Sequence, residues 1–373
     1  MYGQNQDGWI AEMTWAILAF LSHLIFIPGL MDGFSLPKRV YVFSLGIAAV
    51  IFLFSKKREL PLVGLISSYL VVSVIPYLWI VNAPVFIERI ALDVAGFAVF
   101  WAVAVSNISR ERIHTVLLVA IAVAVTVLAV QHFFPLFNGT MGNRSYSAFV
   151  AAQAVPLFLA GSSWAILLSL LILPFSSPSR AALAAAVISL VVFGIARKIF
   201  SIQPFFYVAV LVVVLSPIAV HYNLLSWPDT RKATWQNSVQ MIRTKRDWIF
   251  GIGRGQFEIQ YPAFANRKVR DDLEGAAVDP ERKASLTWGH PHNEFLNSVI
   301  ETGVLGAGLF WSIILFLIRP VRPFDKTHLA IACSLLGTVL FSAFWFPFTH
   351  PSMAITFWAL AGMLWSNKSS RDF

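Results

Sequence analysis

The chain has 373 residues, of which 57% are hydrophobic and only 13% are charged, and its mean hydropathy is +0.70. Soluble domains carry about 25% charged residues, so this composition excludes an ordinary soluble protein and predicts an all-α polytopic membrane protein. The net charge of +9 does not indicate a nucleic-acid partner, because the basic residues lie in short clusters between apolar segments and form no continuous stripe.

Apolar segments recur along the whole chain. A helix that crosses a hydrocarbon core of ~30 Å needs about 20 mostly apolar residues. We predict about 12 transmembrane helices; ten or eleven remain possible, because two of the segments, 147–162 and 163–175, are short and adjacent. The predicted segments are 12–31, 40–54, 61–81, 89–106, 114–134, 147–162, 163–175, 180–196, 203–221, 295–318, 328–346 and 351–366.

The basic residues between these segments predict an orientation. With both termini in the cytoplasm, twelve Lys and Arg residues fall on the cytoplasmic side and five on the outer side. The positive-inside rule, which applies to short loops, favours this arrangement. The five outer residues are Lys38, Arg39, Arg89, Arg144 and Arg180.

The orientation divides the chain into three parts. Residues 1–221 hold nine transmembrane helices, 222–294 form one large outward loop, and 295–373 hold three more helices and a cytoplasmic end. A loop as long as the middle part is usually functional or disordered. We predict that it contains an amphipathic helix, with one face formed by Trp235, Val239, Met241 and Ile242.

Three arginines stand at the outer ends of predicted helices: Arg144, Arg180 and Arg231. A single arginine at a membrane boundary is often only an anchor that reaches the interface. Guanidinium groups also bind phosphate with two hydrogen bonds and keep their charge in a partly dry site. Three of them on one side therefore suggest a site for the diphosphate of a lipid carrier.

A glycine cluster lies in the middle of the outward loop, at Gly251, Gly253 and Gly255. A dinucleotide-binding fingerprint needs the pattern G-x-G-x-x-G between a strand and a helix, and this segment has neither that spacing nor that context. We interpret it as a sharp turn. Arg254 lies inside the turn and is counted as a fourth candidate ligand for the diphosphate.

Histidines gather at the end of the loop. His290 and His292 are two residues apart, Asn293 and Glu294 follow directly, and His350 lies in a short outer loop. Catalytic zinc sites need three protein ligands, and the sequence offers neither an H-E-x-x-H helix nor a thiolate, so no metal is predicted. Asn293 and Glu294 also fit the first residues of a helix, as a cap and as a charge that complements the helix dipole.

Together these groups indicate one kind of chemistry. The arginines would hold a lipid-linked diphosphate and stabilise the charge that grows on it as a leaving group. A neutral histidine would take a proton from an attacking hydroxyl. This is glycosyl transfer from a polyprenyl diphosphate sugar, which requires neither a nucleotide nor a metal.

The histidine segment resembles the signature of the O-antigen ligase and O-antigen polymerase superfamily of bacterial inner-membrane glycosyltransferases, which includes protein O-oligosaccharyltransferases. The signature is His, then Asn, Ser or Gln, then nine residues, then Gly-x-x-Gly. His292 and Asn293 are followed here by residues 294–302 and then by Gly303 and Gly306, which is a complete match.

Further short matches run from about residue 140 to the end of the chain. Arg231 and Trp235 resemble the Arg-x-x-x-Trp entry into the large loop, and Arg180 resembles a Ser-Arg element at a helix start. The chain departs from the Gly-Asn-x-Asn element of the family, because Ser145 or Tyr146 stands where a second Asn is common. The order of the motifs is more specific than any one of them.

The resemblance implies a site and its partners. His292 would activate the acceptor hydroxyl, with His290, Asn293 and Glu294 as further catalytic candidates, and Arg180 and Arg231 would engage undecaprenyl diphosphate. The family fold is helical and related to the GT-C class, and an amphipathic helix in the loop closes the site. The activity is metal-independent and uses no cofactor. The implied donor is a glycan on undecaprenyl diphosphate, the acceptor is lipid A–core, a glycan or a protein, and the site faces the periplasm.

Two alternatives remain. Within the family, the complete signature favours a ligase that acts on a lipid A–core sugar, with a polysaccharide polymerase or a protein O-oligosaccharyltransferase as the runner-up. Outside it, a secondary transporter with twelve helices is the remote alternative. A transporter should show internal repeats, broken helices and ionisable residues near the bilayer midplane. The sequence shows no repeat and few such residues, namely Asp93 and Glu301.

Overall fold

The computed structural model describes residues 6–27, 35–56, 60–106, 108–133, 144–161, 180–197, 229–267, 269, 290–318 and 326–366. Within these ranges the chain is helical, with thirteen α-helices, three short 3-10 helices and no strand, which confirms the all-α prediction. The helices are α1 (Gln6–Leu21), η1 (Ser22–Leu24), α2 (Ser35–Phe54), α3 (Val63–Val74), η2 (Ile75–Leu78), α4 (Ala83–Val105), α5 (Arg110–Phe133), α6 (Arg144–Gly161), α8 (Arg180–Arg197), α10 (Asp229–Val239), α11 (Lys245–Phe250), α12 (Gln256–Gln260), η5 (Tyr261–Ala263), α15 (Glu294–Ile318), α16 (Lys326–Ser342) and α17 (Pro351–Ser366).

Ten of the twelve predicted segments coincide with helices, and the other two, 163–175 and 203–221, lie outside the described residues. Only α2 and α15, among the described helices, are long and apolar enough to cross a membrane by themselves. The count of about twelve spans is therefore not confirmed. Several other apolar helices are shorter than a full span. One of them runs from Val63 to Leu78 and consists of α3 followed directly by η2.

The main core is formed by helices that approach one another closely. Helix α4 packs against α2 and α17, and α16 packs against α6 and α8. Small residues permit the contact between α2 and α4, because a side chain added at Gly46 would meet the Cβ atom of Ala95 at 2.5 Å. Small residues at helix interfaces are the usual means of close packing in membrane proteins.

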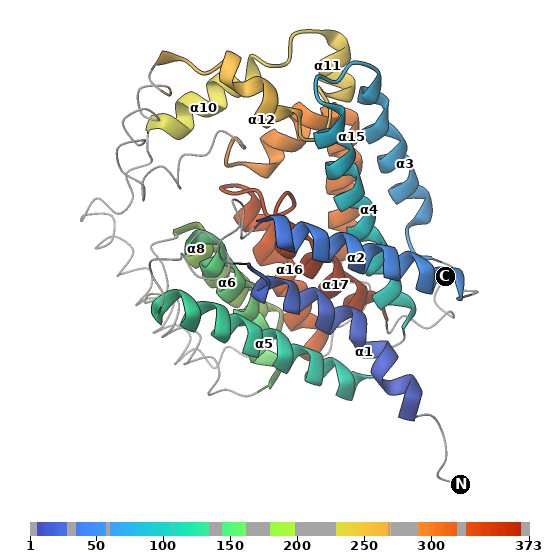
Figure 1. The fold of residues 1–373 in the computed structure, drawn as a ribbon. Coiled ribbons are helices and arrows are strands. Elements are labelled where there is room, and N and C mark those ends of the chain that lie inside the picture. The colour runs from blue at the N-terminus through green and yellow to red at the C-terminus, as the bar shows by residue number, and fades with distance from the viewer. Residues whose placement is uncertain are drawn as a thin grey trace, which may run out of the picture.

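A second, smaller core lies at one end of the bundle. Helices α10, α11 and α12 lie together at the top of Figure 1, next to the upper ends of α3 and α15. Met241, Phe257 and Tyr261 from this layer pack with Ile300 of α15. Residues 229–267 are thus anchored to the bundle through α15.

The predicted amphipathic helix is wrong in its extent and in its apolar face. The segment forms two helices, α10 and α11, separated by residues 240–244. Thr244 caps α11 in a reciprocal capping box with Asp247, which starts a new helix at that point. As a result, Met241 is 2% exposed whereas Val239 is 53% exposed, although both were predicted on one face.

Candidate functional site

The start of α15 is fixed by its own cap and by the loop between α16 and α17. Asn293 is the predicted cap, and its side-chain oxygen accepts a hydrogen bond from the Leu296 amide at 3.0 Å. Glu294 is 1% exposed, and its carboxylate accepts from the amide of Phe348 at 3.2 Å. Its own amide donates to the carbonyl of Trp345 at 3.1 Å. These bonds hold the histidine segment against the loop of residues 343–350.

The two histidines of the motif pack on aromatic rings of that loop. The ring centroids of His290 and Phe346 are 4.2 Å apart, and those of His292 and Trp345 are 5.0 Å apart at an interplanar angle of 85°. His292 has a backbone φ of +53°, in the left-handed region that residues other than glycine rarely adopt. Such strained positions cluster at functional sites, where the surrounding structure maintains them.

A third histidine joins the site through an aromatic neighbour. The rings of His350 and Tyr146 are 4.5 Å apart, and Tyr146 also contacts Trp345 and Phe346. We call Tyr146, Trp345 and Phe346 the aromatic platform. The structure therefore brings His290, His292 and His350 to one platform, although the sequence separates them by up to 60 positions.

Burial controls the protonation of two of these groups. It lowers the pKa of His290 well below 6.5, and the positive charge of Arg89 acts in the same direction. Burial also lowers the pKa of His350, and the positive charge of Lys38 lowers it further. Both imidazoles are therefore neutral near pH 7.

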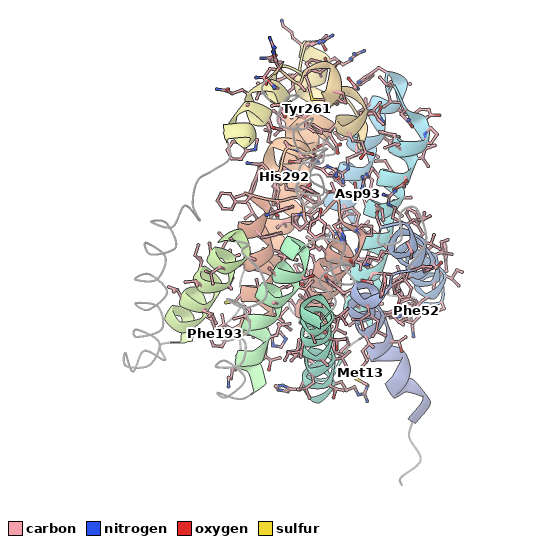
Figure 2. All side chains as sticks on the ribbon, turned by 60° about the vertical axis from the view of Figure 1, so that its left-hand side comes forward. Met13, Phe52, Asp93, Phe193, Tyr261 and His292 are labelled. Carbon is pink, nitrogen blue, oxygen red and sulfur yellow. The ribbon has the colours of Figure 1, made fainter. Side chains whose placement is uncertain are left out.

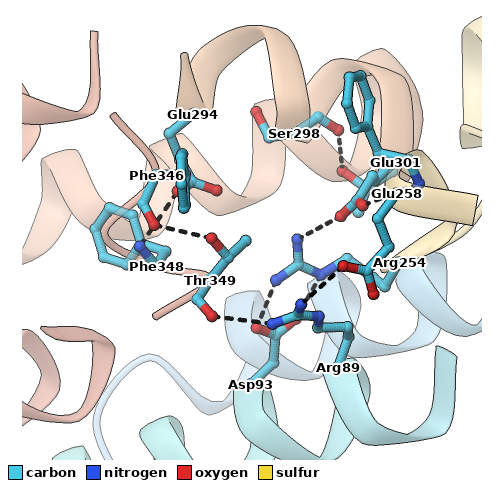
Figure 3. A network of polar contacts seen from close by, with 12 residues as sticks. Arg89, Asp93, Arg254, Glu258, Glu294, Ser298, Glu301, Phe346, Phe348 and Thr349 are labelled. Carbon is cyan, nitrogen blue, oxygen red and sulfur yellow. Dashed lines mark hydrogen bonds and ion pairs between the residues drawn. The ribbon is translucent and has the colours of Figure 1, made fainter. Parts of the chain in front are cut away.

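Arg254 lies in a buried group of opposite charges (Figure 3). Its Nε and one Nη donate to the two oxygens of Asp93 at 3.0 and 2.9 Å, and the other Nη donates to Glu301 at 3.1 Å. Tyr69 donates a further hydrogen bond to Asp93 at 2.8 Å. We call Asp93, Arg254 and Glu301 the buried triad. Since protein carboxylates engage its guanidinium, the arrangement favours a positioning role for Arg254 over its predicted contact with a diphosphate.

The glycines of the two motifs explain how Arg254 reaches this position. Gly251, Gly253 and Gly255 all have positive φ, at 81°, 107° and 74°, so the segment turns sharply as the sequence predicts. Helix α15 is broken at Gly303, with φ 66° and ψ 178°.

The break leaves carbonyl groups of α15 available to the turn. The Ile300 carbonyl accepts from the Ile252 amide at 2.9 Å, and the Glu301 carbonyl accepts from the Gly253 amide at 2.9 Å. The turn and the broken helix thus satisfy each other's backbone groups.

The three remaining predicted arginines, Arg144, Arg180 and Arg231, have side chains outside the described residues, so only their backbones are placed. Arg144 and Arg180 are the first residues of α6 and α8. Arg231 lies in α10, one turn before Trp235, whose indole donates to the Pro291 carbonyl at 2.7 Å. Tyr146 of the platform follows two residues after Arg144. The backbones of Arg144 and Arg231 are therefore tied to the histidine segment or its platform.

The sequence-based prediction missed residues of the site that come from α4. Arg89 was counted only as a topology-setting charge, and Asp93 only as an isolated ionisable residue. Both side chains are buried, and Figure 3 shows them between α4, Arg254 of the glycine turn and Thr349 (Asp93 is also labelled in Figure 2). A spacing of four residues places them on one face of an apolar helix, which is a signal that could have been used.

In the part of the chain that the structure describes, no three His, Cys, Asp or Glu side chains are arranged as metal ligands. The acidic groups of the site, Asp93, Glu301 and Glu294, are instead hydrogen-bonded to the Arg254 guanidinium or to backbone amides.

Comparison with models of protein families gives a match. The family model described as O-antigen ligase matches residues 164–311. That range includes the glycine turn, the histidine motif and the break in α15, whereas α4, α6 and the loop of residues 343–350 lie outside it. No curated protein matches the chain.

Proposed function

We propose that this chain, which belongs to the O-antigen ligase superfamily, is a glycosyltransferase that moves a glycan from undecaprenyl diphosphate to an acceptor hydroxyl at the periplasmic face of the bacterial inner membrane. The observation that supports this most is the fixed position of His292. Its backbone is held in a left-handed conformation between the capped start of α15 and the aromatic platform. A proton acceptor for catalysis has to be oriented in this way.

In the proposed reaction, the imidazole of His292 takes the proton of the acceptor hydroxyl as its oxygen attacks the anomeric carbon of the donor. The new glycosidic bond forms as the bond from that carbon to the diphosphate oxygen breaks. The electron pair leaves with undecaprenyl diphosphate, whose growing negative charge Arg144, Arg180 and Arg231 would stabilise. His292 then loses the proton to solvent or to the departing diphosphate.

His290 and His350 are poorly suited to this role. A general base works best when its pKa lies near the operating pH. Burial holds the pKa values of His290 and His350 well below 6.5, which makes both weak proton acceptors. We assign them to hydrogen bonding in the site, and Arg254 to holding the glycine turn.

The acceptor is proposed to be a lipid A–core sugar, because the His-Asn-x9-Gly-x-x-Gly pattern is complete in this chain. Polymerisation and transfer to protein use the same chemistry and are the alternatives. A transporter would fit the broken helix at Gly303, since transporters use discontinuous helices. The adjacent carboxylates Asp93 and Glu301 are paired with Arg254, however, which argues against their use in ion coupling.

The test is glycan transfer by purified wild-type protein and by His292→Ala in the presence of an undecaprenyl-diphosphate-linked glycan and an acceptor. We expect His292→Ala to lose transfer while its abundance and unfolding temperature stay close to those of wild type. His114→Ala, a change at an exposed histidine on α5, is the matched control and should transfer normally. Normal transfer by His292→Ala would remove His292 from the mechanism.

Deletion of the gene distinguishes the acceptors. Accumulation of lipid-linked polymer with loss of long chains on lipopolysaccharide indicates a ligase. Lipopolysaccharide with single-repeat chains indicates a polymerase. Unchanged lipopolysaccharide with unmodified proteins indicates a protein transferase.

A further inference from the structure

Arg89 is a buried cation that receives little compensation from the protein. Its side chain is 8% exposed, and one Nη donates to the carbonyl of Thr349 at 2.9 Å. Its ion-pair partner, Glu258, lies 3.7 Å away with a side chain that is 32% exposed. The buried Nε of Arg89 has no hydrogen-bond partner among the described residues.

Arg254 is the other buried arginine of the site, and its role is structural. The protein balances its buried positive charge with carboxylates. Three of its N–H groups meet carboxylate oxygens of Asp93 and Glu301 at 2.9 to 3.1 Å. Burial of a charge is costly unless the charge is paired at short range. Arg89 has one neutral acceptor and one longer contact to a partly hydrated carboxylate. Its charge is therefore available to a further anion.

The guanidinium of Arg89 lies against the loop that carries His350. Its hydrogen bond to Thr349 places it beside His350, the next residue along the loop. Its positive charge also contributes, after burial, to lowering the pKa of His290, so it acts on the motif histidine from the α4 side. A neutral imidazole has one N–H donor, and the buried Nδ1 of His290 has no hydrogen-bond partner among the described residues.

We propose that Arg89 binds a phosphate oxyanion of the substrate on the α4 side of the histidine segment. The inference rests on the proposed function and adds a ligand from outside residues 164–311. Three of the sequence-predicted arginines belong to α6, α8 and α10, and the fourth, Arg254, belongs to the glycine turn, whereas Arg89 approaches from α4. The oxyanion belongs either to the diphosphate of the donor or to a phosphate on the acceptor glycan, and both present the same charge-assisted acceptor.

The test measures binding apart from catalysis. Thermal unfolding of the full-length protein in detergent is followed with inorganic pyrophosphate, which represents the donor, and with glucose 6-phosphate, which represents a phosphorylated acceptor. A ligand that binds only the folded protein raises its unfolding temperature. We expect one probe to raise it for wild type and the increase to be lost in Arg89→Met. The probe with the larger effect identifies the source of the phosphate.

Two further variants keep the result interpretable. Arg246→Met removes an arginine whose side chain is 51% exposed on α11, and it should respond to the probe as wild type does. Arg89→Lys keeps the charge but loses the two-pronged contact, so its response should be weaker than that of wild type. Without a probe, Arg89→Met should unfold no lower than wild type, because it removes a poorly compensated charge.

Three results would overturn the proposal: no response of wild type to either probe, an equal response of Arg89→Met and wild type, or a full response of Arg89→Lys. Glycan transfer is measured on the same preparations. An Arg89-dependent response in a protein that transfers no glycan would refute the proposed function and leave the anion site standing.

Discussion

The break in α15 at Gly303 gives the sharpest test of how this site is built. Its φ of 66° and ψ of 178° fall in a region that is essentially restricted to glycine. A Cβ atom at this position would also overlap the carbonyl group of Ile249 at the end of α11. Gly303→Ala therefore forces either α15 to straighten or α11 to move away from it.

The magnitude follows from what is lost. Occupying this backbone region with alanine costs about 1 to 3 kcal/mol. Either movement also removes the bonds from the amides of Ile252 and Gly253 to α15, each worth roughly 0.5 to 1.5 kcal/mol. We expect Gly303→Ala to be destabilised by about 2 to 6 kcal/mol and to lose glycan transfer, because Arg254 is displaced from Glu301.

The assay is unfolding of purified protein by dodecyl sulfate in mixed micelles, followed by tryptophan fluorescence. Gly308→Ala is the matched control, since it makes the same change in the same helix at an exposed position with no atom within 4 Å of the new Cβ. Alanine favours a helix over glycine by about 1 kcal/mol, so Gly308→Ala should be as stable as wild type or more so. Equal stability of the two variants would refute this account of the Gly-x-x-Gly motif.

Two further predictions concern the buried charges. Arg254→Met leaves two buried carboxylates without their positive partner and should lower the free energy of unfolding by about 3 to 5 kcal/mol in the same assay. An effect as small as that of substituting an exposed arginine would contradict the structural role of the buried triad. Burial lowers the folded-state pKa of His290 and of His350. Below about pH 6.5 the unfolded chain therefore binds more protons than the folded chain, whereas at higher pH these histidines are unprotonated in both states. The unfolding temperature of wild type should therefore fall as pH drops below about 6.5, and that of His290→Gln should fall less steeply. An equal slope of unfolding temperature against pH in both proteins would exclude His290 as a source of the pH dependence.

Local patterns in the sequence predicted the features that depend on neighbouring residues. Apolar segments predicted ten of the described helices, Asn293 predicted the start of α15, and the glycine cluster predicted a sharp turn. The same reasoning failed at residues 231–250, where a capping box at Thr244 divides one predicted helix into two. A reciprocal cap of this kind is visible in the sequence but competes with the apolar spacing that suggested a single helix.

Apolar spacing, caps and glycine turns act over a few residues, so the helical class and the histidine motif could be predicted without a structure. Which charges meet depends on the tertiary packing. Arg254 bonds to Asp93 across 161 positions, and Arg89 bonds to Thr349 across 260. Such pairs depend on how helices pack and on whether each buried charge finds a partner, and no local pattern encodes either condition. For that reason one arginine of the predicted binding set became part of the buried triad, and another, counted only as a loop charge, became the proposed ligand for phosphate.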